Sequence, residues 1–282
     1  MSRVDLHIHS TASDGKLTPA DIIHQAAERG LTFIALTDHD TVDGIAPALA
    51  AAQAFPALRV IPGVEISTDI PGEEVHVLGY FIDYTDQELN ITLSRFRDSR
   101  LRRAQGMVAK LKNLGIHIDW QRVREIAGGS SIGRPHIAQA MVEKGYITSV
   151  KQAFAEYLSR HHPAYVEREK MTPAEAVGLV VKAKGLPVLA HPSTLNDPEA
   201  MIIELKAAGL VGIEGYYNGY ASDQIERLVR LAERYNLVAT GGSDYHGLEP
   251  ETETAIGGNE VPIAAAEQLI ALAKQRNPRL KL

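Results

Sequence analysis

The chain has 282 residues, which is enough for one large α/β domain or for a barrel that carries an insertion. Hydrophobic residues make up 45% of it and charged residues 23%, a balance typical of a globular enzyme and not of a disordered chain. The formal net charge of −6 argues against a protein that coats nucleic acid by bulk attraction, but it allows a basic pocket for a phosphorylated ligand. Because there is no cysteine, disulfides, thiolate metal sites and cysteine-phosphatase chemistry are excluded.

No apolar stretch precedes the first strand-like run, and no apolar run is long enough to cross a bilayer. We therefore expect no signal peptide, no membrane contact and a cytoplasmic location. The sequence does not determine the oligomeric state, and a monomer is the default expectation.

Short β-branched runs alternate with helical patterns along most of the chain. The expected strands span residues 4–9, 33–37, 59–65, 75–81, 187–190, 212–216 and 238–242. The expected helices that separate them span residues 19–29, 45–54, 173–184, 198–208 and 223–235. This alternation predicts an α/β fold with either a parallel barrel or an open doubly wound sheet.

Between about residues 89 and 168 the patterns are helical throughout, with helices expected at 93–114, 120–127, 136–144 and 149–159. We interpret residues 89–168 as an inserted helical subdomain that covers the barrel mouth and binds substrate. The barrel itself would then comprise residues 1–88 and 169–282. The glycine-rich loop 128–133 is not expected to be helical.

Polar residues gather where the expected strands end. The residues at or just beyond strand ends are His7, His9, His39, Glu65, His191 and Asp244. Barrel enzymes place their chemistry at this carboxyl-terminal mouth, so the positions favour a barrel. His76 lies near the start of its run, so we expect that strand to run against the others or to be irregular there.

Each candidate also has a simpler explanation. His7 and His9 alternate on a strand and can bind one ion, but an H-x-H pair is as often two exposed or hydrogen-bonded histidines. Asp14 could reach a neighbouring ion or could serve as the turn residue of Ser13-Asp14-Gly15. Glu65 ends an apolar strand, where a buried carboxylate is costly unless it is paired or binds metal, so it could bridge two ions.

The remaining candidate ligands also lie in or next to expected strands. His39 belongs to the polar run Thr37-Asp38-His39-Asp40, which comes directly after an apolar strand, whereas His76 could equally be a core histidine. His191 ends another apolar strand, and Asp244 and His246 follow glycines that allow close backbone approach. Nine candidate ligands suit two or three ions, and imidazole with carboxylate favours Mn, Fe or Zn over Ca or Mg.

Taken in order, D-L-H-I-H-S with a following Asp, T-D-H-D, G-V-E-I-S, E-V-H-V-L-G-Y, A-H-P and G-S-D-Y-H resemble the motifs of the polymerase and histidinol phosphatase (PHP) family. The resemblance covers essentially the whole chain. It implies a distorted (β/α)7 barrel with a trinuclear metal site, often of Mn²⁺. It further implies three ligand sets, which are His7, His9, Glu65 and Asp244; Glu65, His76 and His191; and Asp14, His39 and His246.

Within the family, the length and the insertion with Arg134-Pro135-His136 resemble the stand-alone bacterial branch, which includes 3′,5′-nucleoside bisphosphate phosphatases and a 5′-to-3′ exoribonuclease. The resemblance implies a small phosphorylated nucleotide or a short RNA 5′ end as partner, and removal of the 3′-phosphate of a 3′,5′-bisphosphonucleoside, such as pAp to AMP. A hydroxide bridging two ions about 4 Å apart would be the nucleophile.

We expect four residues to act in catalysis, namely Glu65, His191, Asp244 and Arg134. Arg134 can hold a phosphate with two parallel hydrogen bonds, and His136 can donate another or protonate the leaving oxygen. The alternative is that both simply mark a helix start, with Pro135 in its first turn.

The residues expected to bind substrate are Asp14, Arg134, His136 and Asn218. Glu214 and Tyr216 precede Asn218 after another strand, and a tyrosine there could stack on a base.

Other functions remain open. A metal-dependent amidohydrolase that cleaves a C–N bond would share the barrel, the H-x-H pair and the late Asp, but Asp14, Glu65, His76 and Arg134 favour phosphate. A phosphatase of another small phosphomonoester, of the histidinol-phosphate type, is a further alternative. A non-catalytic metal-stabilised domain would require loss of ligands, and none is lost here.

Overall fold

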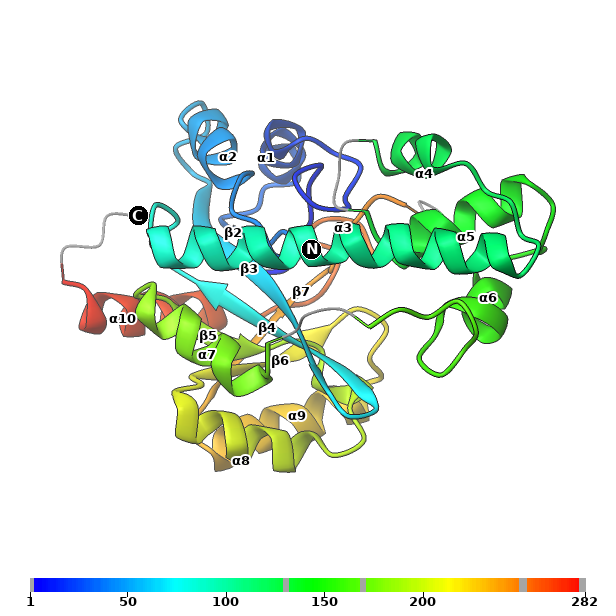
Figure 1. Cartoon of the computed structure of the whole chain (residues 1–282). Coiled ribbons are helices and arrows are strands. Elements are labelled where there is room, and N and C mark those ends of the chain that lie inside the picture. The colour runs from blue at the N-terminus through cyan, green and yellow to red at the C-terminus, as the bar shows by residue number, and fades with distance from the viewer. Residues whose placement is uncertain (1–2, 129–131, 168–170, 249–252, 279–282) are drawn as a thin grey trace. The chain divides into compact units, whose positions relative to one another are not determined.

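The computed structural model describes residues 3–128, 132–167, 171–248 and 253–278 (Figure 1). The chain divides into two compact units. The first unit combines Met1–Ile91 with Met171–Leu282, and the second is Thr92–Lys170.

The first unit contains a seven-stranded sheet whose strand order follows the chain. Its strands are β1 (Val4–Asp5), β2 (Phe33–Leu36), β3 (Arg59–Ile70), β4 (Glu73–Tyr80), β5 (Leu186–Leu189), β6 (Gly212–Tyr217) and β7 (Val238–Gly242). All neighbouring strands pair in parallel except β4, which is antiparallel to both β3 and β5. Of the two alternatives expected for the strand with His76, the structure shows the one in which it runs against the others.

Contacts between the first and last strands close the sheet into a barrel. The Leu6 N–H donates to the Gly241 carbonyl at 3.1 Å, and the His9 N–H donates to the Tyr245 carbonyl at 2.9 Å. Ile8 and Tyr245 form an isolated parallel bridge. Because the segment after Asp5 pairs only through such single contacts, β1 is far shorter than the expected strand at 4–9, and the barrel is distorted.

Six helices of the described first unit lie around the sheet. They are α1 (Pro19–Glu28), α2 (Ile45–Ala52), α7 (Pro173–Lys182), α8 (Pro198–Ala208), α9 (Ser222–Arg234) and α10 (Ile263–Arg276). Helix α7 contacts β4 and β5, and α9 contacts β6 and β7 (Figure 1). The starts of α1 and α7 are set by Thr18 and Thr172, whose hydroxyls accept backbone N–H groups three residues on, each with proline in the first turn.

The second unit is helical and has its own core. It contains most of α3 (Gln87–Asn113), then α4 (Trp120–Ala127), α5 (Arg134–Glu143) and α6 (Val150–Ala153), which continues as a π-helical turn over Phe154–Leu158. Met107, Leu111, Ile137 and Met141 are fully buried in this core. Of the glycine-rich loop, residues 129–131 lie outside the described residues. Within the described residues, no helix has the length and apolar character needed to cross a bilayer.

The close approach of the first and last strands leaves no room for a side chain at Gly242. A Cβ atom there would lie 2.4 Å from His7 N and 2.5 Å from His7 Cβ, so a side chain would push β1 away from β7. Gly178, inside α7, has no atom within 4 Å of an added Cβ. We expect Gly242→Ala to destabilise the fold by about 1–3 kcal/mol through overpacking. Gly178→Ala should instead stabilise it by about 0.5–1 kcal/mol through helix propensity.

Urea unfolding of the two variants beside the parent chain measures this difference. Equal midpoints for Gly242→Ala and the parent would contradict the close approach of the two strands.

Candidate metal centre

All nine candidate ligands lie in the first unit, and most of them come from the carboxyl ends of its strands. His7 and His9 follow β1, His39 follows β2, Glu65 lies in β3, His76 in β4, His191 follows β5, Asp244 and His246 follow β7, and Asp14 lies in the loop before α1. The carboxyl ends of parallel strands meet at one mouth. The antiparallel β4 brings His76 there from near its amino end.

The first ligand group is His7, His9, Glu65 and Asp244. The Nε2 atoms of His7 and His9 each lie 3.2 Å from Glu65 Oε2, and they lie 3.2 and 3.0 Å from Asp244 Oδ1. None of these four buried atoms has a hydrogen-bond partner in the described part of the chain. Atoms bound about 2.1 Å from one ion lie about 3 Å from each other, so the group fits a divalent cation.

Glu65 faces a second group through its other oxygen. Its Oε1 lies 2.7 Å from His76 Nδ1 and 3.2 Å from His191 Nε2, and its Oε2 also lies 3.1 Å from His39 Nδ1. His39, Glu65 and His76 have ligand atoms within 4.8 Å of one another. One carboxylate thus presents its two oxygens to two sets of imidazoles, which is the geometry that a bridging ligand needs.

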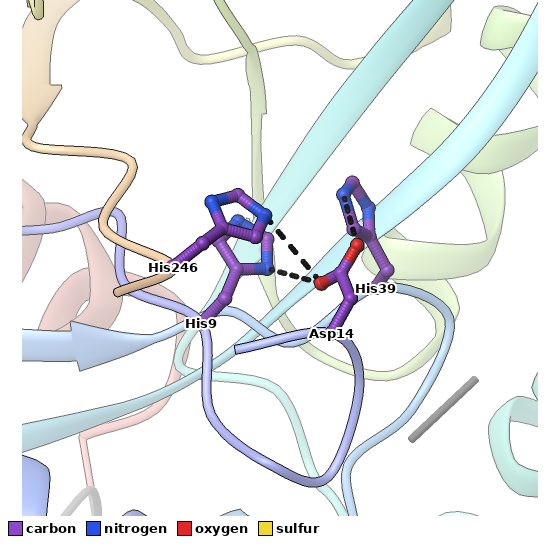
Figure 2. A group of neighbouring side chains, drawn as sticks. All are labelled: His9, Asp14, His39 and His246. Atoms are coloured by element: carbon purple, nitrogen blue, oxygen red, sulfur yellow. Dashed lines mark ion pairs between the residues drawn. The ribbon is translucent and has the colours of Figure 1, made fainter. Parts of the chain in front are cut away.

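The third group surrounds Asp14 (Figure 2). Asp14 Oδ1 lies 3.4 Å from His246 Nε2 and 3.7 Å from His9 Nδ1, and Asp14 Oδ2 lies 3.9 Å from His39 Nε2. His9 therefore faces the first group with one ring nitrogen and the third group with the other. The resemblance assigned His9 to the first set alone.

Charge compensation in this cluster is strong. Burial favours the neutral acid, but the surrounding histidines, His39 and His76 foremost, hold the pKa of Glu65 well below its usual range. Burial opposes the charged form of His76 as well, yet the carboxylate of Glu65 raises its pKa to about 10. Burial lowers the pKa of His39 to about 3. Without cations, protons on some of the imidazoles balance the carboxylates, and divalent ions would displace those protons.

Two of the ligand-bearing positions have unusual backbone conformations. His191 has a φ of 28° and Asp244 a φ of 52°, in the left-handed region that non-glycine residues seldom adopt. Such conformations persist only where the surrounding structure holds them, and they are concentrated at functional sites.

Asp38 supports the loop that carries Asp14. Its carboxylate accepts hydrogen bonds from the Ser10 N–H at 2.7 Å, the Ser10 hydroxyl at 2.7 Å and the Ser13 hydroxyl at 2.6 Å. Burial raises its pKa. The sequence marked the T-D-H-D run as a site, but the supporting role of its first aspartate depends on contacts made 25 and 28 residues away.

In β6 the structure places Tyr217 at the site, where the sequence led us to expect Tyr216. Two residues of β6, Glu214 and Tyr216, oppose the adjacent pair Thr240 and Gly241 of β7, so Gly215 forms a bulge. The bulge reverses the alternation of side chains, so that Tyr217 reaches the site while Tyr216 packs against the core. The Tyr217 hydroxyl donates to Asp244 Oδ2 at 2.6 Å.

Residues near the end of β6 have further partners. Glu214, fully buried, bonds to His7 Nδ1 at 3.0 Å and accepts the His191 N–H at 2.8 Å. Asn218, expected to bind substrate, accepts a hydrogen bond from the Thr254 hydroxyl. The sequence signal for Glu214 was a lone carboxylate within the apolar run Gly212–Tyr217. The contact of Tyr217 depends on the bulge, and that of Asn218 depends on Thr254, which is distant in the sequence.

Arg134 and His136 belong to the second unit, where they begin α5 with Pro135 in its first turn. The Arg134 guanidinium lies 5.4 Å from the centre of the Phe154 ring. His136 Nδ1 accepts the Gly133 N–H at 3.0 Å, so a neutral ring carries its proton on Nε2 and can donate from there. The helix-start interpretation is confirmed, and a role in binding phosphate remains a prediction.

Removal of the Asp38 side chain should destabilise the chain. Asp38→Ala leaves a buried backbone N–H and two hydroxyls without their acceptor, at about 1–3 kcal/mol for each unsatisfied group. Asp38→Asn keeps one acceptor oxygen and an amide that a serine hydroxyl can accept from, so it should retain most of the stability. Thermal unfolding of both variants tests this, and equal losses from the two would show that the hydrogen bonds are not what Asp38 contributes.

Known proteins resemble the chain over most of its length. The sequence model of the PHP domain family matches residues 5–167. A 3′,5′-nucleoside bisphosphate phosphatase from Chromobacterium violaceum is 37% identical over 254 residues, which are 87% of this chain and 88% of the relative. A 5′-3′ exoribonuclease from Haemophilus influenzae is 34% identical over 86% of this chain and 90% of its own length.

A solved structure agrees with this relationship. It is of an amidohydrolase from Chromobacterium violaceum with bound sulfate, which is 34% identical, covers 96% of both chains and has a TM-score of 0.85. Sequence and fold together show that this chain belongs to the PHP domain family.

Proposed function

We propose that this chain removes the 3′-phosphate of 3′,5′-bisphosphonucleosides, such as pAp, and that short 5′-phosphorylated RNA is a further substrate. Membership of the PHP domain family makes it a metal-dependent phosphoesterase. The narrower proposal takes its support from the relatives named as a bisphosphate phosphatase and an exoribonuclease. A cytoplasmic location and a monomeric state remain predictions.

The observation that carries the metal-dependent part of the proposal is a set of buried ligand nitrogen and oxygen atoms that have no hydrogen-bond partner among the described residues. These atoms are His7 Nε2, both ring nitrogens of His9, Asp14 Oδ1, Glu65 Oε2, His76 Nε2 and Asp244 Oδ1. A buried polar atom without a partner is costly, so such a concentration calls for cations.

We propose three divalent ions, with Mn²⁺ as the native metal and Fe or Zn as alternatives, because the ligands are imidazoles and carboxylates without thiolate. His7, His9, Glu65 and Asp244 would hold one ion, Glu65, His76 and His191 a second, and Asp14, His39 and His246 a third. His39 lies close enough to Glu65, and His9 to Asp14, to take part in a neighbouring set.

Ions held there would supply an activated water at neutral pH and neutralise charge on the phosphoryl oxygens. Glu65 fixes the spacing of the first two sets through its two oxygens, and His191 and Asp244 complete them. The guanidinium of Arg134 can bind a second, remote phosphate, and His136 can donate a hydrogen bond from Nε2.

The proposal predicts two to three tightly held divalent ions per chain. Chelation should abolish turnover. Glu65→Ala should be the most damaging single ligand change, because the bridging carboxylate serves two sets at once. Elemental analysis and a phosphomonoester assay measure both effects.

His117→Ala is the control, since His117 lies exposed in the second unit and should leave the metal content unchanged. A fully active preparation with one ion or fewer would overturn the trinuclear assignment. Cleavage of cyclic amides but not of phosphomonoesters would point instead to the amidohydrolase alternative.

Arg134→Ala tests the substrate. If its guanidinium binds the phosphate that is not cleaved, kcat/KM for a 3′,5′-bisphosphonucleoside should fall about 10–100-fold, since a hydrogen bond to a charged group contributes about 1.5–3 kcal/mol. A simple monoester has no second phosphate and should be affected much less.

Steady-state kinetics on both substrates distinguish the outcomes. Equal losses would assign Arg134 to the reacting phosphate or to the fold. If kcat/KM fell on neither substrate, the second unit would not take part in substrate binding.

A further inference from the structure

Glu214 stands out among the buried charged residues because it contacts two proposed ligands without belonging to any ligand group. Its side chain is fully buried. It lies in β6, and no member of the three ligand groups comes from that strand. The proposed reaction leaves this carboxylate without a role.

Each oxygen of Glu214 has a separate partner. Oε1 lies 3.0 Å from His7 Nδ1, while His7 Nε2 faces Glu65 and Asp244. Oε2 accepts the backbone N–H of His191 at 2.8 Å, while His191 Nε2 faces Glu65. His7 and His191 belong to different proposed ion sets, so one side chain contacts a ligand of each.

The contact with His7 decides which ring nitrogen is available to an ion. A carboxylate offers only acceptors, so the nitrogen that it contacts must carry the proton. With Nδ1 protonated, a neutral His7 has its lone pair on Nε2, the atom that points into the cluster. A carboxylate on the far nitrogen also raises the basicity of a ligating imidazole.

The contact with His191 holds a strained backbone. At a φ of 28° and a ψ of 56° this residue lies outside the regions that non-glycine residues prefer. A hydrogen bond from its N–H to a buried carboxylate helps to keep it in that conformation, and the conformation determines where the His191 ring points.

We propose that Glu214 is a positioning residue of the metal centre, which sets the tautomer of His7 and the backbone of His191 and so orients one ligand for each of two ions. This inference rests on the proposed metal site, and it adds β6 to the elements that build it.

Glu214→Gln is the sharpest variant because it keeps the size of the side chain. The N–H of His191 can only donate, so the single amide oxygen must face it. The amide NH₂ then faces His7 Nδ1, which has to accept, and the His7 proton moves to Nε2, where it blocks the ion. We expect the affinity for Zn²⁺ at the tightest site to fall about 10–100-fold, as is typical when the partner of a ligating histidine is lost.

Glu214→Asp separates positioning from packing. It keeps two acceptors but leaves unfilled volume, whereas Gln fills the volume and loses an acceptor. A positioning role predicts that Asp retains more Zn²⁺ affinity than Gln, and a purely structural role predicts the reverse order. Glu199→Gln, at an exposed carboxylate on α8 that contacts Arg234 and Tyr235, should leave the affinity unchanged.

Chelator competition with Zn²⁺ gives the affinities, and ¹⁵N NMR of the Zn²⁺-loaded parent chain gives the His7 tautomer without any variant. We expect the proton on Nδ1. A proton on His7 Nε2 in the parent, or a Gln variant that binds Zn²⁺ as tightly as the parent, would overturn the role of Glu214 while leaving the proposed function intact. A parent chain that bound no Zn²⁺, Mn²⁺ or Fe²⁺ would overturn both.

Discussion

The interaction on which the site depends is that of the Glu65 carboxylate with the imidazoles around it. Its side chain is 1% exposed, and burial of an unpaired carboxylate would be prohibitive. The five histidines within 3.2 Å of its oxygens are His7, His9, His39, His76 and His191. Positive charge on these imidazoles, or on divalent ions that replace their protons, is therefore what allows the Glu65 carboxylate to be buried.

The antiparallel direction of β4 brings one of these imidazoles, that of His76, to the Glu65 carboxylate. In a parallel barrel only the carboxyl ends of strands reach the mouth. The tight pairing of β3 with β4 places Ser67 opposite His76, two residues beyond Glu65, so that an imidazole from the start of a strand reaches the Glu65 carboxylate. A parallel β4 would have placed His76 at the opposite end of the barrel. The reversal that looks like a defect in the (β/α) pattern is therefore the means of adding a ligand.

The elements that the sequence predicted correctly are those whose sequence signals lie within the element itself. The strand at 238–242 and the helices with a Thr-Pro start were found within a few residues, since alternation and capping need only neighbouring positions. Helix α10 was missed because Pro262, which precedes it, offers no side-chain cap. The bulge at Gly215 was missed because it is defined by the pairing of β6 with β7, and it decided which of two adjacent tyrosines faces the site.

The residues that are proposed to bind ions are also residues that cost the folded chain stability. His191 and Asp244 adopt unfavourable backbone conformations, and several ligand atoms are buried without hydrogen bonds from the described residues. Both features cost free energy in the folded chain, and bound cations would offset part of that cost by giving the ligand atoms partners. Ions that bind only the folded state stabilise it by mass action, so occupancy of the site and stability of the barrel rise together. Asp38 supports the loop that carries Asp14, and Glu214 accepts the N–H of the strained His191, so both prepare ligands before an ion binds. The free energy of ion binding is then not spent on ordering the site.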